Sequence, residues 1–477
     1  MQVAGMIAAA LATAAALVAP APRVRGAGTL LAAALALALL IDDLARSDRL
    51  DTLTGRPGTL AAGAVVVAAL LAAGAVLVAR HPAVLAVAAV AALPFRVPLG
   101  VDGDTVNLLV PLYGVIGAGL LASAARELRG QATRRKPRAL EWLLVASITL
   151  YAVQSAYSGD VDKALEQIVF FYVPFALLFK LLAELEWTPR LIRACLVTTV
   201  GLALAFCALG FFQYATGTVW LNEKLLNANT YTTYFRVNSL FFDPNVYGRY
   251  LILAMIGVTA VALWDHHTHS AAAVLAVLWL GLLTTRSESS MVALVVGVGT
   301  LALLRGDPGR LVRRGAVALA AVAAVGIAVA LLTGNASLRK ATSGRSALVE
   351  GGAELFAERP LQGWGSGAFS LEYERQDVAP GTVSASHTVP VTVAAEQGVI
   401  GLAVYVALLV AAFGRLFRPR IVSAARAAIA AAFAALWVHT LLYAAFLEDP
   451  ITWALLAAGT ALAQTSSSAT SESPTSM

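Results

Sequence analysis

The amino-acid sequence predicts an all-α polytopic membrane protein with about 12–15 transmembrane helices. Apolar residues make up 59% of the 477 residues and charged residues only 13%, too little charge to cover a soluble protein of this size. Apolar runs of roughly 15–22 residues, near the length that crosses a bilayer, recur from end to end. The alternating pattern of a membrane β-barrel is absent, so we expect helices to satisfy the backbone in lipid.

Fifteen apolar runs are the upper count, since several are short enough to cross only half of the bilayer or to be fused with a neighbour. The runs are residues 4–22, 27–41, 58–79, 82–95, 105–124, 139–156, 164–183, 190–213, 249–264, 270–285, 288–304, 315–332, 398–414, 423–446 and 450–464.

Clusters of Lys and Arg in the short loops predict the orientation, because such loops stay on the cytoplasmic side. The net charge of +6 comes mostly from these loops and does not predict nucleic-acid binding. Counting spans from any one cluster puts the other three on the same side. The four clusters are residues 23–25, 126–138, 305–314 and 415–420.

The same count puts residues 42–57, 214–249 and 333–397 outside the membrane. We therefore expect one transmembrane domain over residues 1–464, with 214–249 and 333–397 forming an extracytoplasmic active-site region that contains short helices. The Ser/Thr-rich residues 465–477 predict a disordered tail.

The first outer segment offers candidate substrate-binding residues around an Asp-Pro-Asn sequence at 243–245. Asp-Pro-Asn is a turn signal, because the residue before proline avoids the helical region. Arg236 and Arg249 flank this turn, and Asn245 belongs to it. A single arginine at the membrane surface more often anchors a helix than binds a substrate, and this holds for Arg249 above all.

The second outer segment predicts a surface helix over residues 343–360, which Pro360 ends. Arg345 lies in its first turn, where free backbone N–H groups and the helix dipole favour an anion. Pairing of Arg345 with a helix glutamate is the alternative. Three glycines around Trp364 permit tight turns and close backbone approach, and Trp364 is a membrane-surface anchor or a platform for a sugar.

His387 lies just before the next predicted span, whose first turn Pro390 suits. Histidine can exchange a proton near neutral pH, although most single histidines are structural or exposed. No second His or Cys stands at ligand spacing, so we expect neither a metal nor another cofactor. Arg286, near the outer ends of two runs, pairs with Glu288 or binds a ligand.

Taken in order, these motifs resemble the O-antigen ligase and polymerase superfamily of bacterial membrane glycosyltransferases. The resemblance extends over about residues 230–402 and rests on the order, spacing and shared outer side of its motifs. The motifs are Arg236 with the Asp-Pro-Asn turn, Thr-Thr-Arg-Ser at 284–287, Arg345, Pro-Leu-Gln-Gly-Trp-Gly at 360–365, and His387 with Glu-Gln-Gly at 396–398.

The resemblance implies a GT-C-like, metal-independent enzyme that moves a glycan from a polyprenyl-diphosphate carrier to an acceptor hydroxyl with inversion. It implies that Arg236 and Arg345 bind the diphosphate, that His387 takes the acceptor proton or orients the acceptor, and that Arg286 has a supporting role. The family usually shows His-Asn, whereas Thr388 follows His387 here, so part of that motif is missing.

The implied partners are the lipid-linked donor, an acceptor glycan, lipid or protein, and membrane lipid, at the outer face of the bacterial cytoplasmic membrane. Ligase and polymerase share these motifs, and the sequence does not separate them. A transporter or flippase is the alternative from another class, which predicts ionisable residues at mid-membrane and internal pseudo-symmetry. A non-catalytic scaffold for polysaccharide assembly is a further alternative.

Overall fold

Helices dominate the computed structural model, which describes residues 1–46, 57–101, 104–132, 136–220, 222–231, 234–265, 268–306, 345–376, 388–418, 421 and 423–471. Within these ranges, nine helices are long and apolar enough to cross a membrane, and three shorter apolar helices accompany them. The predicted all-α polytopic membrane fold is confirmed. The predicted run 315–332 lies outside the described residues.

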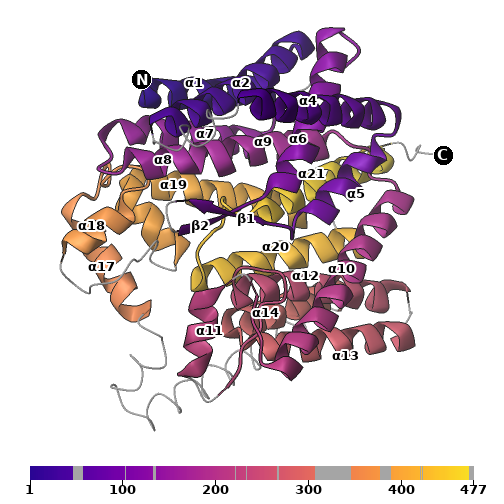
Figure 1. Cartoon of the computed structure of the whole chain (residues 1–477). Coiled ribbons are helices and arrows are strands. Elements are labelled where there is room, and N and C mark those ends of the chain that lie inside the picture. Colours follow the sequence, from indigo (N-terminus) through magenta and orange to yellow (C-terminus); the bar gives the residue numbers. More distant parts are fainter. Residues whose placement is uncertain are drawn as a thin grey trace.

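The first half of the chain forms one group of helices, drawn in indigo to purple in Figure 1. Helices α1 and α2 pack on each other, and α2 and α4 pack on α6. The helices of this half are α1 (Gln2–Val18), α2 (Pro22–Arg46), α4 (Pro57–Arg80), α5 (Ala83–Ala92), α6 (Val110–Leu128), α7 (Ala139–Gln154), α8 (Val161–Glu166), the π-helix η2 (Gln167–Tyr172) and α9 (Val173–Ala183), with the short 3-10 turn η1 (Ser155–Tyr157) after α7.

The second half adds another group and the helices that join the two. Helices α12, α14 and α20 contact one another, while α19 packs on α7 and α21 packs on α9 (Figure 1). The last three helices therefore connect the two groups. The elements of this half are α10 (Pro189–Thr216), α11 (Glu223–Thr230), α12 (Pro244–Asp265), α13 (Thr268–Thr285), α14 (Glu288–Arg305), α17 (Arg345–Glu358), α18 (Phe369–Arg375), α19 (Val389–Phe417), α20 (Ala424–Leu442) and α21 (Pro450–Ser471).

Three of the four basic clusters lie at one end of the molecule, as the orientation count requires. Arg25 forms an ion pair with Glu127, next to Arg126. Arg138, at the start of α7, and Arg415, near the end of α19, line one shallow pocket. At the other end of these two antiparallel helices, Gln154 donates hydrogen bonds to the carbonyl oxygens of residues 362 and 397. The sequence motifs of 360–398 therefore lie at the end opposite to the arginines.

Three boundaries differ from the sequence prediction. Residues 104–108 belong to an antiparallel hairpin, β1 (Val97–Val101) with β2 (Asp104–Leu108), whereas the run 105–124 was predicted to be one span. An Asp-Gly sequence at 102–103 is a hairpin signal, which the overall hydropathy obscures. Helix α12 begins at Pro244, inside the predicted turn, and α21 continues to Ser471, into the predicted tail.

Candidate active site

Arg236 is held in place by its backbone and by two side-chain contacts. Asn229 of α11 accepts a hydrogen bond from the backbone N–H of Arg236 and donates one to its carbonyl oxygen. The guanidinium donates from Nε to the carbonyl oxygen of Thr285, at 3.0 Å, and from Nη2 to Oδ1 of Asn245, at 3.5 Å. Both acceptors are neutral, so in the described part of the chain the positive charge of Arg236 has no carboxylate partner.

Arg286 follows Thr285 directly and therefore lies next to this contact. Its backbone adopts a left-handed conformation with φ of 52°, and its side chain is exposed. The guanidinium carbon lies 5.6 Å from the ring centroid of Tyr234, two residues before Arg236. The anticipated ion pair with Glu288 does not form, since neither residue makes an ion pair among the described residues. The structure thus brings Arg236 to Asn245 and places Arg286 directly after Thr285, which Arg236 contacts.

The Asp-Pro-Asn turn joins these arginines to the C-terminal part of the chain. Asp243 accepts a hydrogen bond from the backbone N–H of Asn245 at 2.6 Å, and α12 begins at Pro244 between them. The side chain of Asp243 also hydrogen-bonds Tyr443. One turn thereby contacts Arg236 on one side and Tyr443 on the other.

Arg249 has a different environment from Arg236. It is buried with 2% of its surface exposed, forms an ion pair with Asp449, and lies over the Tyr443 ring at 5.5 Å. A buried, paired guanidinium fixes α12 to the segment before α21 and has little charge left for a substrate. The contacts therefore favour a structural role for Arg249 over the substrate-binding role predicted from the sequence.

A buried serine and histidine cluster lies behind the turn, and sequence reasoning did not single it out. Ser289 and Ser290, in the first turn of α14, each lie 3.2 Å through Oγ from Nε2 of His439 in α20. Ser290 Oγ also donates to the carbonyl oxygen of Asn245. A histidine inside an apolar run is the sequence signal that could have revealed this cluster, because polar side chains in spans need partners.

The glycine-rich loop at 360–365 packs against a break in α19. Gly398 has φ of 64° and ψ of −163° inside the helix, so the chain kinks there. Backbone hydrogen bonds then join the two segments: Val399 N–H to the carbonyl of Pro360, and Gly365 N–H to the carbonyl of Glu396, both at 2.8 Å. A Cβ on Gly363 would lie 2.3 Å from the carbonyl oxygen of Glu396, so the close backbone approach predicted for these glycines is present.

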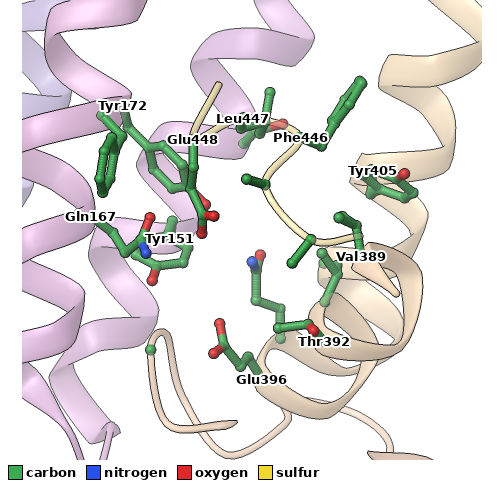
Figure 2. Close-up of a pocket in the computed structure, with 18 of the residues that line it drawn as sticks. Tyr151, Gln167, Tyr172, Val389, Thr392, Glu396, Tyr405, Phe446, Leu447 and Glu448 are labelled. Carbon is green, nitrogen blue, oxygen red and sulfur yellow. The ribbon is translucent and has the colours of Figure 1, made fainter. Parts of the chain in front are cut away.

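This pairing places Glu396 beside a cavity of about 310 Å³. Figure 2 shows Tyr151, Gln167 and Tyr172 on one wall and Thr392 and Glu396 of α19 on another, with Glu448 reaching in from the segment before α21. Glu396 Oε1 accepts a hydrogen bond from the backbone N–H of Phe369. Tyr443, the partner of Asp243, also lines the cavity, so the cavity and the Arg236 contact are joined through one residue.

Burial raises the pKa of Glu448 above its usual value, while Lys163 lowers it and Glu166 raises it further. Glu448 follows a predicted span as part of a turn, and sequence reasoning left its role open. Glu396 lies within the first turns of a membrane helix, where a carboxyl side chain signals a functional or paired group. Neither residue was predicted to belong to the site.

Trp364 packs under α17. Its Nε1 donates a hydrogen bond to the carbonyl oxygen of Leu355 at 2.9 Å, and the Arg359 guanidinium lies 3.7 Å from its ring centroid. Together with Leu355, Phe369 and other apolar side chains it forms a small separate core. One ring face is covered and the N–H is used, so these contacts favour an anchoring role over a sugar platform.

Two of the predicted catalytic residues, Arg345 and His387, belong to the second outer segment. Arg345 is the first residue of α17, which confirms the surface helix and its first-turn position. His387 lies outside the described residues. Thr388, which follows it, donates from Oγ1 to the carbonyl oxygen of Leu441, so α19 begins beside the segment that lines the cavity. Among the described residues, no three His, Cys, Asp or Glu side chains gather as metal ligands do.

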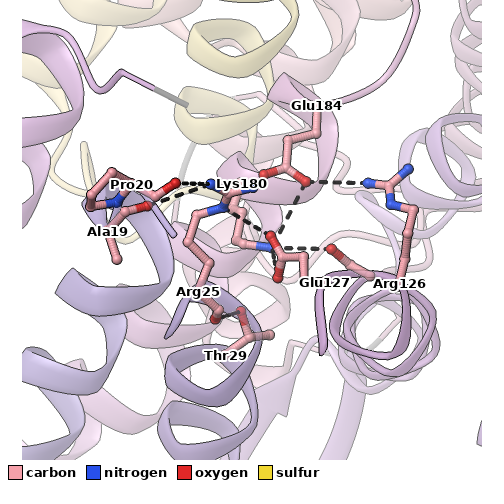
Figure 3. A network of polar contacts seen from close by, with 9 residues as sticks. Ala19, Pro20, Arg25, Thr29, Arg126, Glu127, Lys180 and Glu184 are labelled. Atoms are coloured by element: carbon pink, nitrogen blue, oxygen red, sulfur yellow. Dashed lines mark hydrogen bonds and ion pairs between the residues drawn. The ribbon is translucent and has the colours of Figure 1, made fainter. Parts of the chain in front are cut away.

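A second group of buried charges lies at the basic end of the molecule (Figure 3). Glu127 is fully buried and accepts from Arg25 Nε at 3.0 Å and from Lys180 Nζ at 3.1 Å. Lys180 also donates to Ser123. Sequence reasoning placed the charged groups in outer loops and missed this network, because its members are far apart in the chain. Each of the two cations has a carboxylate partner, as a structural network requires.

We expect Glu127→Gln to destabilise the protein strongly, because it removes the nearest carboxylate from two buried cations, Arg25 and Lys180. Removing one partner from a buried ionic network costs about 3–5 kcal/mol. Thermal unfolding of the detergent-purified protein measures the effect. Glu184→Gln is the matched control, since Glu184 lies 3.5 Å from Arg126 and 3.8 Å from Lys180 but is 16% exposed. Equal effects of the two substitutions would contradict the central role of Glu127.

Comparison with known families is informative for one part of the chain. No curated protein and no solved structure matches this chain. Residues 272–406 match the family model described as O-antigen ligase. The matched region includes Arg286, the glycine-rich loop, Glu396 and the kink at Gly398. The resemblance to the O-antigen ligase superfamily that the motif order indicated is thereby confirmed over residues 272–406, while Arg236 and the Asp-Pro-Asn turn lie before the matched region.

Proposed function

We propose that this protein transfers a glycan from a polyprenyl-diphosphate carrier to an acceptor hydroxyl, with inversion at the anomeric carbon and without a metal ion. The family match supports glycosyltransferase activity of the O-antigen ligase or polymerase type. The donor, the carrier and the mechanism are what the resemblance to this superfamily implies, and the chemistry of the site supports them.

The observation that carries this proposal is the environment of the Arg236 side chain. Its guanidinium is half-buried, is positioned by the neutral acceptors Thr285 O and Asn245 Oδ1, and has no acidic partner in the described part of the chain. Arg286 follows Thr285, which Arg236 contacts, and makes no ion pair with any residue that the structure describes. Two guanidinium groups that no described carboxylate neutralises suit a diphosphate, because the planar fork of arginine binds phosphate oxygens through two hydrogen bonds.

The reaction needs charge stabilisation and one base. The bond between the anomeric carbon and the diphosphate oxygen breaks, and the carrier diphosphate leaves with both electrons. The acceptor oxygen bonds to the anomeric carbon from the opposite face and loses its proton. Arg236 and Arg345 stabilise the negative charge that grows on the leaving diphosphate, and His387 takes the proton.

The position of the site supports an extracytoplasmic reaction at the cytoplasmic membrane. Arg236, the Asp-Pro-Asn turn and the 360–398 motifs lie at one end of the helices, and the arginines at 25, 126, 138 and 415 lie at the other. Since arginine-rich loops face the cytoplasm, the site faces outward. The acceptor is another glycan, a lipid or a protein for a ligase, and a second lipid-linked unit for a polymerase.

The test supplies the purified protein with polyprenyl-diphosphate glycan and candidate acceptors, in the presence of a chelator, and measures release of polyprenyl diphosphate. We expect turnover in the wild type and a loss of about 10²–10⁴-fold in His387→Ala, the range for removing a general base. His269→Ala, in α13, is the control and should retain full turnover. No release of polyprenyl diphosphate with any acceptor would favour the transporter alternative, in which the carrier bond stays intact.

A further inference from the structure

The cavity beside α19 is lined mainly by acidic side chains, whereas the site around Arg236 is positively charged. Its charged lining residues are Lys163, Glu166, Glu396 and Glu448. Lys163 is the one cation among the described lining residues, and its Nζ lies 2.8 Å from Glu166 Oε2. Among the lining residues that the structure describes, a ligand inside the cavity therefore meets three carboxyl groups and no unpaired positive charge.

An unused hydrogen-bond acceptor shows which kind of ligand this lining suits. Gln167 is 7% exposed, and its Oε1 has no hydrogen-bond partner among the described residues. Figure 2 shows Gln167 on the same wall as Tyr151, near the carboxyl group of Glu448. A buried acceptor without a partner costs free energy, which a ligand O–H or N–H recovers. Gln167 begins the π-helix η2, and such irregular turns occur frequently at functional sites.

The size of the cavity limits the ligand to a small unit. Its volume of about 310 Å³ is near the lower end of the ~300–1,000 Å³ that small-molecule pockets occupy. Aromatic side chains such as Tyr151, Tyr172 and Tyr405 line it together with the polar groups. Aromatic surfaces combined with hydrogen-bond acceptors suit a sugar ring, which has apolar faces and a rim of hydroxyl groups.

We propose that this cavity binds one uncharged sugar residue of the glycan, that its carboxyl and amide oxygens accept hydrogen bonds from the sugar hydroxyls, and that it rejects sugars carrying a negative charge. The proposal rests on the proposed glycosyl transfer. It separates the substrate into two parts. The diphosphate lies at Arg236 and Arg345, with Arg286 in a supporting role, and a neutral sugar lies among Glu396, Glu448 and Gln167. The contact from Asn245 through Asp243 to Tyr443 joins the two parts.

Saturation-transfer NMR on the full-length protein in detergent tests this proposal without any turnover. The probes are methyl glucoside and methyl glucuronide, and methyl galactoside and methyl galacturonide, each pair differing in charge at one carbon. We expect the neutral member of at least one pair to bind about tenfold more tightly or better, since like charges in a buried site repel each other. Thr392→Phe, which fills the cavity, should abolish the signal of that neutral probe.

The charge selection itself is tested with Glu448→Gln. This variant should bind the neutral probe within about threefold of the wild type and lower its preference over the charged probe at least about threefold, because one repulsive charge is removed. Glu354→Gln removes an exposed carboxylate of α17 outside the cavity lining and should leave the preference unchanged. Thermal unfolding verifies that each variant is folded.

The outcomes separate this inference from the proposed function. Absence of binding by all four probes, equal or tighter binding of the charged members, or a preference that Glu448→Gln does not change would each overturn the cavity assignment, even where carrier diphosphate is released in the transfer assay. Neutral-sugar binding that depends on Glu448 supports the assignment, even where no transfer is observed.

Discussion

Arg236→Ala is expected to lower the rate of glycan transfer by about 10³-fold or more. Removing one positioned donor of charge stabilisation costs about 10²–10³, and arginines that stabilise a departing phosphate are worth about 10³–10⁵. Arg236 Nε and Nη2 are fixed by Thr285 O and Asn245 Oδ1, so its fork is positioned before the substrate arrives. Release of polyprenyl diphosphate, measured at saturating acceptor, gives the rate.

Arg236→Lys separates charge from geometry. Lysine keeps the positive charge but cannot form two parallel hydrogen bonds, so we expect it to recover only a small part of the lost rate. Arg375→Ala is the matched control, because the Arg375 side chain is 62% exposed and paired with Glu372. Exposed ion pairs contribute little to stability, so the loss of Arg375 should change the transfer rate less than twofold. Full activity of Arg236→Ala in folded protein would refute the phosphate-binding role.

Gly398→Ala is expected to abolish activity and to lower the unfolding temperature. At φ of 64° and ψ of −163° the backbone is in a region essentially confined to glycine, and strain of this kind costs about 1–3 kcal/mol. A Cβ there would also lie 2.3 Å from the carbonyl oxygen of Leu361. To avoid that contact, the loop 360–365 must move away from α19. It then loses the backbone hydrogen bonds between Pro360 and Val399 and between Gly365 and Glu396, which position Glu396.

Gly414→Ala in the same helix is the control for Gly398→Ala. An added Cβ at Gly414 meets nothing within 4 Å, and alanine favours a helix over glycine by about 0.5–1 kcal/mol. We therefore expect Gly414→Ala to retain activity with unchanged or slightly raised stability. Limited proteolysis near the loop 360–365 should increase only in Gly398→Ala. If both variants behave alike, the backbone pairing does not hold the loop.

Much of the local structure of this chain could be predicted from neighbouring residues. The surface helix that begins at Arg345 and ends before Pro360, and the helix start at Pro390, follow from amphipathic spacing and from the missing N–H of proline. The grouping of the basic clusters at one end follows from the alternation of spans. The hairpin of β1 and β2 was missed because Val106 and Leu108 of β2 run directly into the apolar helix that follows, so hydropathy merged the strand with that helix.

The sequence by itself determined the membrane fold, the two ends of the helices and the superfamily resemblance, because hydropathy, charge and the order of motifs act along the chain. Only the tertiary structure decided which candidates meet. It paired Arg249 with Asp449 across 200 positions, left Arg236 with neutral partners, and built one cavity from Gln167, Glu396 and Glu448. Whether a charged side chain is neutralised by a partner depends on which groups packing brings within about 4 Å of it. A single sequence does not show which of two residues so far apart in the chain will meet.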